Sequence, residues 1–194
     1  MGASQLVWFI PGYLLGSIPF GLLLTRLIGI DIRSVGSGNI GTTNVLRTGN
    51  KGLAAATLLL DGGKGALAVL LASHFAGVGA GMLAGMAAFI GHCYPVWLKL
   101  RGGKGVATLL GVALVAVPLA GLAALLAWLT GALVTRYSSV GGMAAAVAAP
   151  VAAAALGQPH AALSLAVMAV LLIWKHRENI GRLRAGTESR IGQK

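Results

Sequence analysis

Three short polar segments carry almost every residue in this chain whose type and spacing could do chemistry. They are Ser37–Asn44 with Arg47 just beyond it, Gly91–Gly105, and Lys175–Glu188. Each combines glycines with Lys, Arg, Asn or His side chains, and long apolar runs separate the three. Polar residues are costly close to a bilayer, so three such segments between apolar runs predict one assembled site. Glycines that expose backbone N–H groups, together with cations, are typical of phosphate binding.

The first segment has the composition of a backbone anion nest, a turn whose N–H groups point toward one anion. Gly38 and Gly41 can adopt the positive φ values that such a turn needs. The side-chain donors expected to join it are Ser37, Asn39, Asn44 and Arg47, the last with a fork suited to two parallel phosphate contacts. The alternative is a polar loop that only turns the chain, which explains the glycines but not so many donors beside an arginine.

The second segment places Gly102, Gly103 and Gly105 around Lys104, just before a helix expected to begin near Val106. Backbone donors at that place coincide with the positive end of the helix dipole, and Lys104 adds a point charge. The pattern is not a P-loop, because no strand is expected before it and no Ser or Thr follows the lysine directly. The alternative is a basic turn that sets the orientation of the protein in the membrane.

Two histidines lie at the expected ends of apolar helices. His92 precedes Pro95, and a histidine in such a place is more often a structural hydrogen-bonding residue, so it is only a candidate for substrate contact. His176 and Asn179 are three residues apart and share one face if the last helix continues through them. Because histidine titrates near neutral pH, His176 can act as an acid, a base or a hydrogen-bond donor.

Asp61 and Lys64 are the charged residues expected inside an apolar helix. They are three residues apart, so they share a helix face and can neutralise each other. We interpret them as a structural pair at the rim of the site.

The composition is that of a membrane protein. Of 194 residues, 57% are hydrophobic and 10% are charged, against about 45–50% apolar residues in soluble domains. Lys and Arg number 15 against 4 Asp and Glu, a net charge of +11. The basic residues do not form a soluble domain with interleaved aromatics, so nucleic acid is not an expected partner. Cys93 is the only cysteine, which excludes a disulfide framework, and its neighbour His92 alone makes a poor metal site. We expect no metal and no cofactor.

The apolar runs predict an all-α, polytopic membrane helix bundle with seven transmembrane helices and a single domain over residues 1–194. A span needs about 20 apolar residues to cross the hydrocarbon core. Pro118 lies near the middle of one long run, and two short helices are favoured there over one tilted helix, since proline breaks the helical hydrogen bonds. The expected helices cover about 4–25, 53–75, 105–117, 119–135, 140–156 and 161–174. Another, the third in chain order, is expected to run from the turn at 77–81 to about residue 97.

The distribution of charge orients these spans. With seven crossings and the N-terminus outside, all three polar segments and the C-terminus face the cytoplasm. So do 14 of the 15 basic residues, while the remaining one, Lys64, lies within a span. This asymmetry is what the positive-inside rule predicts. Six crossings would put the second and third polar segments on opposite sides of the membrane.

Taken together, the three segments resemble a known family, the bacterial acyl-phosphate:glycerol-3-phosphate acyltransferases. The family motifs are Ser-Gly-Asn-x-Gly-x-x-Asn, Gly-His-x-x-Pro followed by Gly-Gly-Lys-Gly, and His-x-Glu-Asn-Ile followed by Gly-x-Glu. The matching residues are Ser37 to Asn44 with Arg47, Gly91 to Pro95 with Gly102 to Gly105, and His176 to Ile180 with Gly186 to Glu188. The motifs occur in order and span almost the whole chain.

The resemblance implies the first committed step of phospholipid synthesis. An acyl group passes from acyl phosphate to the 1-hydroxyl of sn-glycerol 3-phosphate, which gives lysophosphatidic acid and phosphate. Enzymes of this family are multi-pass proteins of the bacterial cytoplasmic membrane, with an active site that faces the cytoplasm. They depend on the enzyme that makes acyl phosphate, and they do not use acyl-CoA directly.

The candidate site residues follow from the segments and the resemblance together. Catalytic roles are expected for Ser37, Arg47, Lys104, His176 and Asn179. Substrate contacts are expected for Gly38, Asn39, Gly41, Asn44, His92, Gly102, Gly103, Gly105 and Ser139, and structural support near the site for Asp61, Lys64 and Glu188. One departure is Gly142, where relatives often carry a serine after Tyr-x-Ser. Ser138 or Ser139 is the candidate to replace it.

Two other classes of function fit part of the pattern. A small membrane transporter of phosphate-bearing anions could use broken helices, glycine-rich loops and an intramembrane ion pair, but alternating access favours a site near the midplane. A lipid-binding scaffold could use basic loops alone, but it would not need the donors at Ser37 and Asn179. Phosphate-dependent flux into sealed vesicles would favour the transporter.

Overall fold

The computed structural model describes residues 3–192, and within that range the chain is helical, with no strand. The α-helices are α1 (Ala3–Leu6), α2 (Phe9–Gly16), α3 (Phe20–Arg26), α4 (Thr42–Leu46), α5 (Lys51–Ala76), α6 (Val78–Cys93), α7 (Val106–Ala116), α8 (Pro118–Thr135), α9 (Ser138–Ala155), α10 (Pro159–Lys175) and α11 (Arg177–Arg184). Two short 3-10 helices, η1 (Ile32–Ser34) and η2 (Val96–Leu98), lie in the loops. A helix satisfies its own backbone hydrogen bonds, as lipid requires. The all-α prediction is confirmed.

Five segments of the described chain are long and apolar enough to cross a membrane. They are Phe9–Arg26, Lys51–Ala76, Val78–Leu98, Pro118–Thr135 and Ser138–Ala155. α10 and α11 make a sixth candidate when they are counted together across a bend of 53°, and α7 is a shorter apolar helix. Large apolar side chains such as Phe75 and Leu133 are exposed, as expected where helices face lipid. The count of seven crossings stays a prediction.

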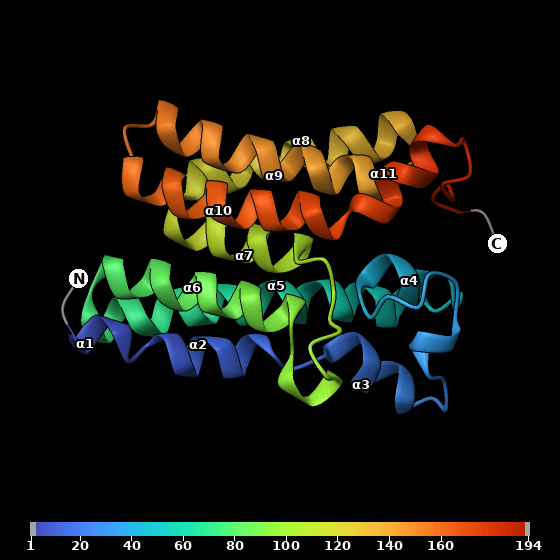
Figure 1. The fold of residues 1–194 in the computed structure, drawn as a ribbon, viewed down its shortest axis with the longest axis horizontal. Coiled ribbons are helices and arrows are strands. Elements are labelled where there is room, and N and C mark those ends of the chain that lie inside the picture. Colours follow the sequence, from blue (N-terminus) through green and yellow to red (C-terminus); the bar gives the residue numbers. More distant parts are fainter. Residues whose placement is uncertain (1–2, 193–194) are drawn as a thin grey trace. The chain divides into compact units, whose positions relative to one another are not determined.

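Contacts divide the chain into two compact units, one that ends at Val112 and one that begins at Ala113. In the first unit, α5 and α6 form an antiparallel hairpin, and α2 packs along it (Figure 1). Glycines permit this close approach. A Cβ on Gly85 would lie 2.7 Å from Val69, and one on Gly12 would lie 2.4 Å from the carbonyl oxygen of Ala84. The prediction of a single domain stays a prediction.

The first span is interrupted between α2 and α3. Pro19 lies in the gap and has no N–H to continue the helical ladder. Side chains from other elements satisfy the carbonyls that the interruption exposes. Trp97 Nε1 donates to Ser17 O at 2.8 Å, and Lys64 Nζ donates to Ile18 O at 2.8 Å. The sequence predicted this span but not the break within it.

In the second unit, α8, α9 and α10 pack as successive antiparallel hairpins (Figure 1). The backbones of α8 and α9 come close, since a Cβ on Gly141 would lie 2.4 Å from Trp128 O. The predicted break at Pro118 is confirmed, and the proline is the first residue of α8, where a missing N–H costs nothing. A Cβ on Gly121 would lie 2.4 Å from the backbone of Leu114, so α8 turns back along the end of α7.

Candidate functional site

The first two polar segments lie at the same end of the α5–α6 hairpin. The first precedes α5 and the second follows α6, and in an antiparallel pair the start of one helix lies beside the end of the other. Apolar packing supports this arrangement, because Leu98 of η2 packs against the buried cluster that contains Ile40 and Val45. The loops around Ser37–Arg47 and Gly102–Gly105 therefore form one polar end of the first unit (Figure 1).

The backbone nest predicted for the first segment does not form. Gly38 has a φ of 68°, as expected, but Gly41 has a φ of −83°. The N–H groups instead bond within the loop: Ser37 N donates to Asn44 Oδ1 at 3.1 Å, Gly38 N to Val35 O at 2.9 Å, and Gly41 N to Asn39 Oδ1 at 2.8 Å. The three N–H groups therefore have acceptors within the loop in this structure. Contact of Gly38 and Gly41 with a substrate stays a prediction.

Asn44 is the centre of this loop. Its side chain is buried, and Nδ2 donates to the carbonyls of Ile32, Val35 and Asn39 at 3.1, 2.9 and 2.8 Å. An amide nitrogen has two hydrogens, and these acceptors use both. Asn44 therefore shapes the loop, and its contact with a substrate stays a prediction.

Asn44 and Gly36 set the position of Arg47. Arg47 Nη1 donates to Asn44 Oδ1 at 3.4 Å. Gly36 has a φ of 52°, and a Cβ there would lie 2.8 Å from Arg47 Cδ, so only glycine leaves room for the arginine. Ser37 beside it is exposed. The loop thus offers a hydroxyl and a guanidinium. The sequence analysis missed Gly36, because only the backbone reveals its positive φ.

Close packing onto the end of α6 requires the glycines of the second segment. Gly102 N donates to Cys93 O at 3.2 Å, and Gly103 N donates to His92 O at 3.0 Å, which satisfies carbonyls at the helix end. A Cβ on Gly102 would lie 2.2 Å from His92 O, and one on Gly103 would lie 2.1 Å from His92 Nε2. These two N–H groups were expected to bind phosphate, and in this structure carbonyls of α6 accept them, so substrate contact at Gly102 and Gly103 stays a prediction.

The same loop fixes the backbone of Lys104 at the start of α7. Gly105 has a φ of 90°, and a Cβ there would lie 2.2 Å from the ring of Phe89. α7 begins at the next residue, Val106. A cation held at the first turn of an apolar helix, where the dipole also favours negative charge, suits an anionic ligand.

The expected pairing of Asp61 with Lys64 is present. Lys64 Nζ lies 2.7 Å from Asp61 Oδ1, and the two side chains are 1% and 3% exposed. His92 Nδ1 lies 3.6 Å from the same oxygen, and Thr108 Oγ1 donates to the Asp61 backbone carbonyl at 3.0 Å. Removal of one charge from such a pair typically costs about 3–5 kcal/mol, because the other charge stays buried without its partner.

The third segment begins at a bend between α10 and α11. The bend of 53° interrupts the straight helical face expected for His176 and Asn179. His176 is buried at this bend, and its Nδ1 lies 2.8 Å from Leu172 O. A carbonyl only accepts, so Nδ1 carries the hydrogen and the neutral ring has its lone pair on Nε2. His176 can therefore accept a hydrogen bond or a proton at Nε2.

Glu188 joins Asn179 to the start of α9. Its Oε1 accepts from Asn179 Nδ2 at 2.5 Å and from Ser139 Oγ at 2.7 Å, and its Oε2 accepts from Arg182 Nε at 2.6 Å. Ser139 lies in the first turn of α9, whereas Asn179 and Arg182 lie on α11. One carboxylate thus holds two elements together and orients an amide expected to be catalytic.

The contact with Glu188 gives Ser139 a partner within the protein. A hydroxyl has one hydrogen, and Ser139 donates it to Glu188. Contact of Ser139 with a phosphate, in place of the serine that relatives often carry at position 142, stays a prediction. Arg182 as a partner of Glu188 was missed by the sequence analysis. Its spacing of three residues from Asn179 on one helix was the available signal.

Glu188 stays ionised to lower pH than an ordinary glutamate. Partial burial alone would raise the pKa of its carboxyl group. Hydrogen bonds from Asn179, Ser139 and Arg182, with the positive charge of Arg182, outweigh burial and hold this pKa below its ordinary value. The network is therefore in its charged form at neutral pH.

Comparison with known proteins assigns the family. The family model for glycerol-3-phosphate acyltransferase matches residues 6–186. The chain belongs to the glycerol-3-phosphate acyltransferase family. A protein of that name from Agrobacterium fabrum (strain C58) is 59% identical over 184 residues, which cover 94% of this chain and 90% of the relative. One from Ruegeria sp. (strain TM1040) is 60% identical over 190 residues, which cover 97% and 94%.

Two solved structures resemble this acyltransferase over nearly its full length. Both are crystal structures of PlsY (YgiH), an integral membrane glycerol 3-phosphate acyltransferase. The glycerol 3-phosphate form has a TM-score of 0.93 and 40% identity, and the lysophosphatidic acid form has 0.90 and 39%. Each match covers 98% of this chain and 96% of the other. The family and the enzyme class predicted from the motifs are confirmed, and the protein is a multi-pass membrane acyltransferase.

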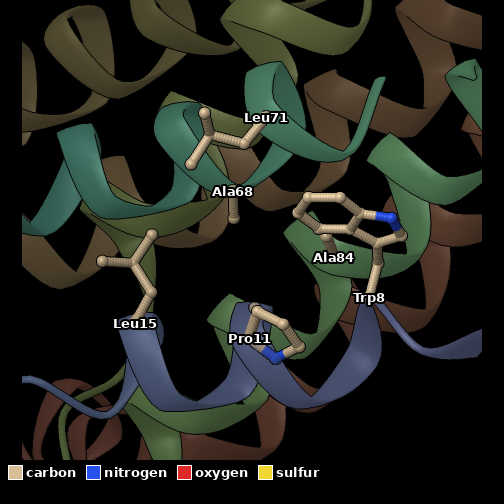
Figure 2. Close-up of a pocket in the computed structure, with 7 residues that line it drawn as sticks. Trp8, Pro11, Leu15, Ala68, Leu71 and Ala84 are labelled. Carbon is tan, nitrogen blue, oxygen red and sulfur yellow. The ribbon is translucent and has the colours of Figure 1, made fainter. Parts of the chain in front are cut away.

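An apolar pocket of the acyltransferase lies away from the polar end of its first unit. The pocket, shown in Figure 2, is lined by Trp8, Pro11, Gly12, Leu15, Ala68, Leu71 and Ala84. Ala68 and Leu71 belong to the second half of α5, whereas the polar segments adjoin its start. The lining carries no charged residue, so the pocket does not suit a phosphate group.

The side chains typical of metal sites are dispersed in this acyltransferase. Within residues 3–192, no three His, Cys, Asp or Glu side chains lie close enough to share a metal ion. Cys93 is buried, forms no disulfide and follows His92 directly, and two ligands do not complete a tetrahedral site.

Proposed function

We propose that this protein transfers an acyl group from an acyl phosphate to the 1-hydroxyl of sn-glycerol 3-phosphate, giving lysophosphatidic acid and phosphate. The observation that carries the proposal is the likeness over 98% of the chain to an acyltransferase whose structures are of a glycerol 3-phosphate form and a lysophosphatidic acid form. These molecules are the acceptor and the product of one acyl transfer. The motifs of the polar segments support acyl phosphate as the donor.

Arg47 and Lys104 neutralise the phosphate groups of the two substrates. The position of Arg47 against Asn44 and Gly36 supports this role, since a guanidinium held in one orientation can make two parallel phosphate contacts. Lys104 acts as a point charge at the start of α7, where the helix dipole adds to its attraction.

Ser37 and Asn179 position the acyl carbonyl and stabilise the negative charge that develops on its oxygen. Donors oriented before the reaction stabilise such charge without a reorganisation cost. The contact of Asn179 with Glu188 supports this role, because it fixes the plane of the amide. Glu188 is then a structural support that orients Asn179.

The transfer needs no strong base. The phosphate of an acyl phosphate is already a good leaving group, so positioning supplies much of the rate. The 1-hydroxyl oxygen bonds to the acyl carbon, the bond from that carbon to the phosphate oxygen breaks, and the hydroxyl proton passes to the departing phosphate. His176 orients the acceptor by accepting a hydrogen bond from this hydroxyl at Nε2, a role supported by the Nδ1 contact to Leu172 O.

The protein works in the bacterial cytoplasmic membrane, with seven crossings, the N-terminus outside and the polar segments in the cytoplasm. The concentration of basic residues in the proposed cytoplasmic loops supports this orientation. Glycerol 3-phosphate and acyl phosphate then both reach the site from the cytoplasmic side, and the enzyme that forms acyl phosphate supplies the donor.

Product formation by the purified protein in lipid vesicles tests the proposal. Glycerol 3-phosphate is supplied with either a long-chain acyl phosphate or the matching acyl-CoA. Lysophosphatidic acid is expected only with acyl phosphate, together with one phosphate per acyl group transferred. Product from acyl-CoA alone contradicts the donor, and flux of glycerol 3-phosphate into sealed vesicles without any product contradicts the enzyme in favour of a transporter.

A further inference from the structure

We propose that Asp61, Lys64 and His92 are positioning residues that hold the loop Gly102–Gly105, and with it Lys104, in place for phosphate binding. The inference rests on the proposed function. It assigns to Asp61 and Lys64 a role beyond the mutual neutralisation that their spacing predicts, and to His92 a role other than substrate contact.

A series of polar contacts runs from the first span to this loop. Lys64 Nζ donates to Ile18 O at 2.8 Å and to Asp61 Oδ1 at 2.7 Å. The same carboxylate oxygen lies 3.6 Å from His92 Nδ1. His92 meets the loop twice, because its carbonyl accepts from Gly103 N at 3.0 Å and its Nε2 lies 2.1 Å from where a Cβ on Gly103 would be.

Burial makes simple structural pairing an insufficient explanation. The three side chains are at most 4% exposed, in helices that are otherwise apolar. Charges at such depth are costly, and apolar residues of the same size often replace a buried pair without loss of stability. What the pair adds is a negative charge 3.6 Å from His92 Nδ1 and a donor for the interrupted first span.

Two kinds of contact tie the loop to the end of α6, backbone hydrogen bonds and the imidazole of His92. The N–H groups of Gly102 and Gly103 bond to the end of α6, and Gly103 lies directly on the imidazole of His92. A change in the ring orientation therefore moves Gly103 and the next residue, Lys104. A displacement of about 1 Å at a positioning group can lower a rate about a hundredfold.

The first test uses the neutral double variant Asp61→Asn/Lys64→Met, because either single change leaves a charge buried. We expect a thermal midpoint near that of the wild type, but at least about tenfold lower kcat/KM, mainly through a higher KM for one phosphate substrate. If the double variant has both the thermal midpoint and the kcat/KM of the wild type, the pair is only structural and the proposal is overturned.

The second test keeps the ion pair and changes only the ring, in His92→Gln. Trypsin cleavage after Lys99, Arg101 and Lys104 reports on the loop without any substrate, with cleavage after Arg136 as the reference within each sample. We expect loop cleavage to be about tenfold faster in this variant, as when a protected segment opens more often. A protected loop with normal activity in His92→Gln overturns the proposal even if the double variant does not fold.

A matched control comes from the same helix. Thr57 is buried in α5, and its hydroxyl donates to Leu53 O of its own helix at 2.8 Å. Thr57→Val is expected to leave loop cleavage and KM unchanged. If Thr57→Val raises KM and loop cleavage as the double variant does, the loss of any polar group from α5 has this effect and the assignment fails.

Combination of the two changes tests whether they act in series. The triple variant is Asp61→Asn/Lys64→Met/His92→Gln. Its kcat/KM is expected to be no more than about twofold below that of the less active of the double variant and His92→Gln, because all three residues act through one series of contacts. Effects that multiply contradict the proposal. A wild type without activity toward acyl phosphate would refute the proposed function, whereas the trypsin measurements would still test the loop.

Discussion

Arg47 and Lys104 reach the polar end of the first unit by different means. The guanidinium of Arg47 donates a hydrogen bond to Asn44 Oδ1 and occupies the space left by Gly36. The backbone of a glycine loop packed on α6 carries Lys104. The planar guanidinium of Arg47 must be correctly oriented to bind a phosphate, whereas the ammonium of Lys104 acts as a point charge, so the two cations are not interchangeable.

Replacement of Lys104 by Ala is expected to lower acyl transfer at least about a hundredfold, because a charge that stabilises the transferred group is lost. The protein should still purify folded, with a thermal midpoint like that of the wild type. The matched control is Lys99→Asn, an exposed cation of the same loop with a φ of 51° that Asn tolerates. Turnover of Lys104→Ala close to that of the control would refute the role of Lys104.

His176 offers a substitution that separates its two ring nitrogens. Asn at this position can keep a donor near Leu172 O, in place of Nδ1, but it has no group where Nε2 lies. We expect His176→Asn to fold normally and to lose about a hundredfold or more in kcat, since the acceptor hydroxyl is no longer oriented. His176→Asn with nearly unchanged kcat would make His176 a structural residue of the bend.

At the level of elements, the same sequence, Gly-Gly-Lys-Gly, serves two purposes. In α5 it is helical, and its Lys64 is buried beside Asp61. Before α7 it is a loop that folds over the end of α6. The helical copy has an acid three residues before the lysine on the same face, whereas the second copy follows Pro95 and a 3-10 turn that end the preceding helix.

The two copies predict opposite effects for one substitution. Gly103→Ala would put a Cβ 2.1 Å from the His92 ring and is expected to displace the loop and reduce transfer at least about tenfold. Gly63→Ala meets nothing within 4 Å and should leave activity unchanged while it raises stability by about 0.5–1 kcal/mol, since alanine favours helix. Thermal midpoints and initial rates measure both. Equal effects at the two glycines would contradict the assigned packing.

α11 depends on the ionised carboxylate of Glu188, and this gives a pH dependence. The folded protein binds a proton at Glu188 more weakly than the unfolded chain, because its pKa is held below the ordinary 4.5. The stabilisation is thus fully present above that ordinary pKa and is lost as the pH falls through the lower pKa of the folded state. Glu188→Gln should lower the thermal midpoint by a few degrees at pH 7, and the difference should shrink as the pH falls below 4.5.

The control for this experiment is Glu178→Gln, an exposed carboxylate on the same helix. It should follow the wild type across the pH range. A difference between Glu188→Gln and the wild type that stays constant from neutral pH to below 4.5 would show that the network does not depend on the charge of Glu188.

For the whole molecule, the proposed orientation predicts which loops are reachable from each side of the membrane. In a Cys93→Ser background, Lys51→Cys, Arg101→Cys and Thr187→Cys should react with an impermeant maleimide only after the cells are permeabilised. Gln158→Cys should react in intact cells, because it precedes α10 on the proposed outer side. Labelling of Arg101→Cys but not Thr187→Cys in intact cells would contradict seven crossings and support six.

The sequence alone predicted the main apolar helices and the family, and it favoured a break at Pro118. Apolar runs and prolines act locally, since each helix in lipid must satisfy its own backbone, and this makes helix positions predictable from composition. The three motifs identified the acyltransferase because several unusual residues occur at fixed short spacings. The break near Pro19 escaped prediction, because the donors that permit it, Lys64 and Trp97, come from distant parts of the chain.

Only the tertiary structure decided which polar groups have partners within the protein. Spacing marked Asn44, Ser139 and the Gly102–Gly103 backbone as donors, and each proved to be used by an internal acceptor. Ser139 and its acceptor Glu188 are 49 residues apart, and Lys64 and its acceptor Ile18 are 46 apart. A donor has few hydrogens, and the partner that takes them is set by packing between elements. Sequence spacing does not report that packing.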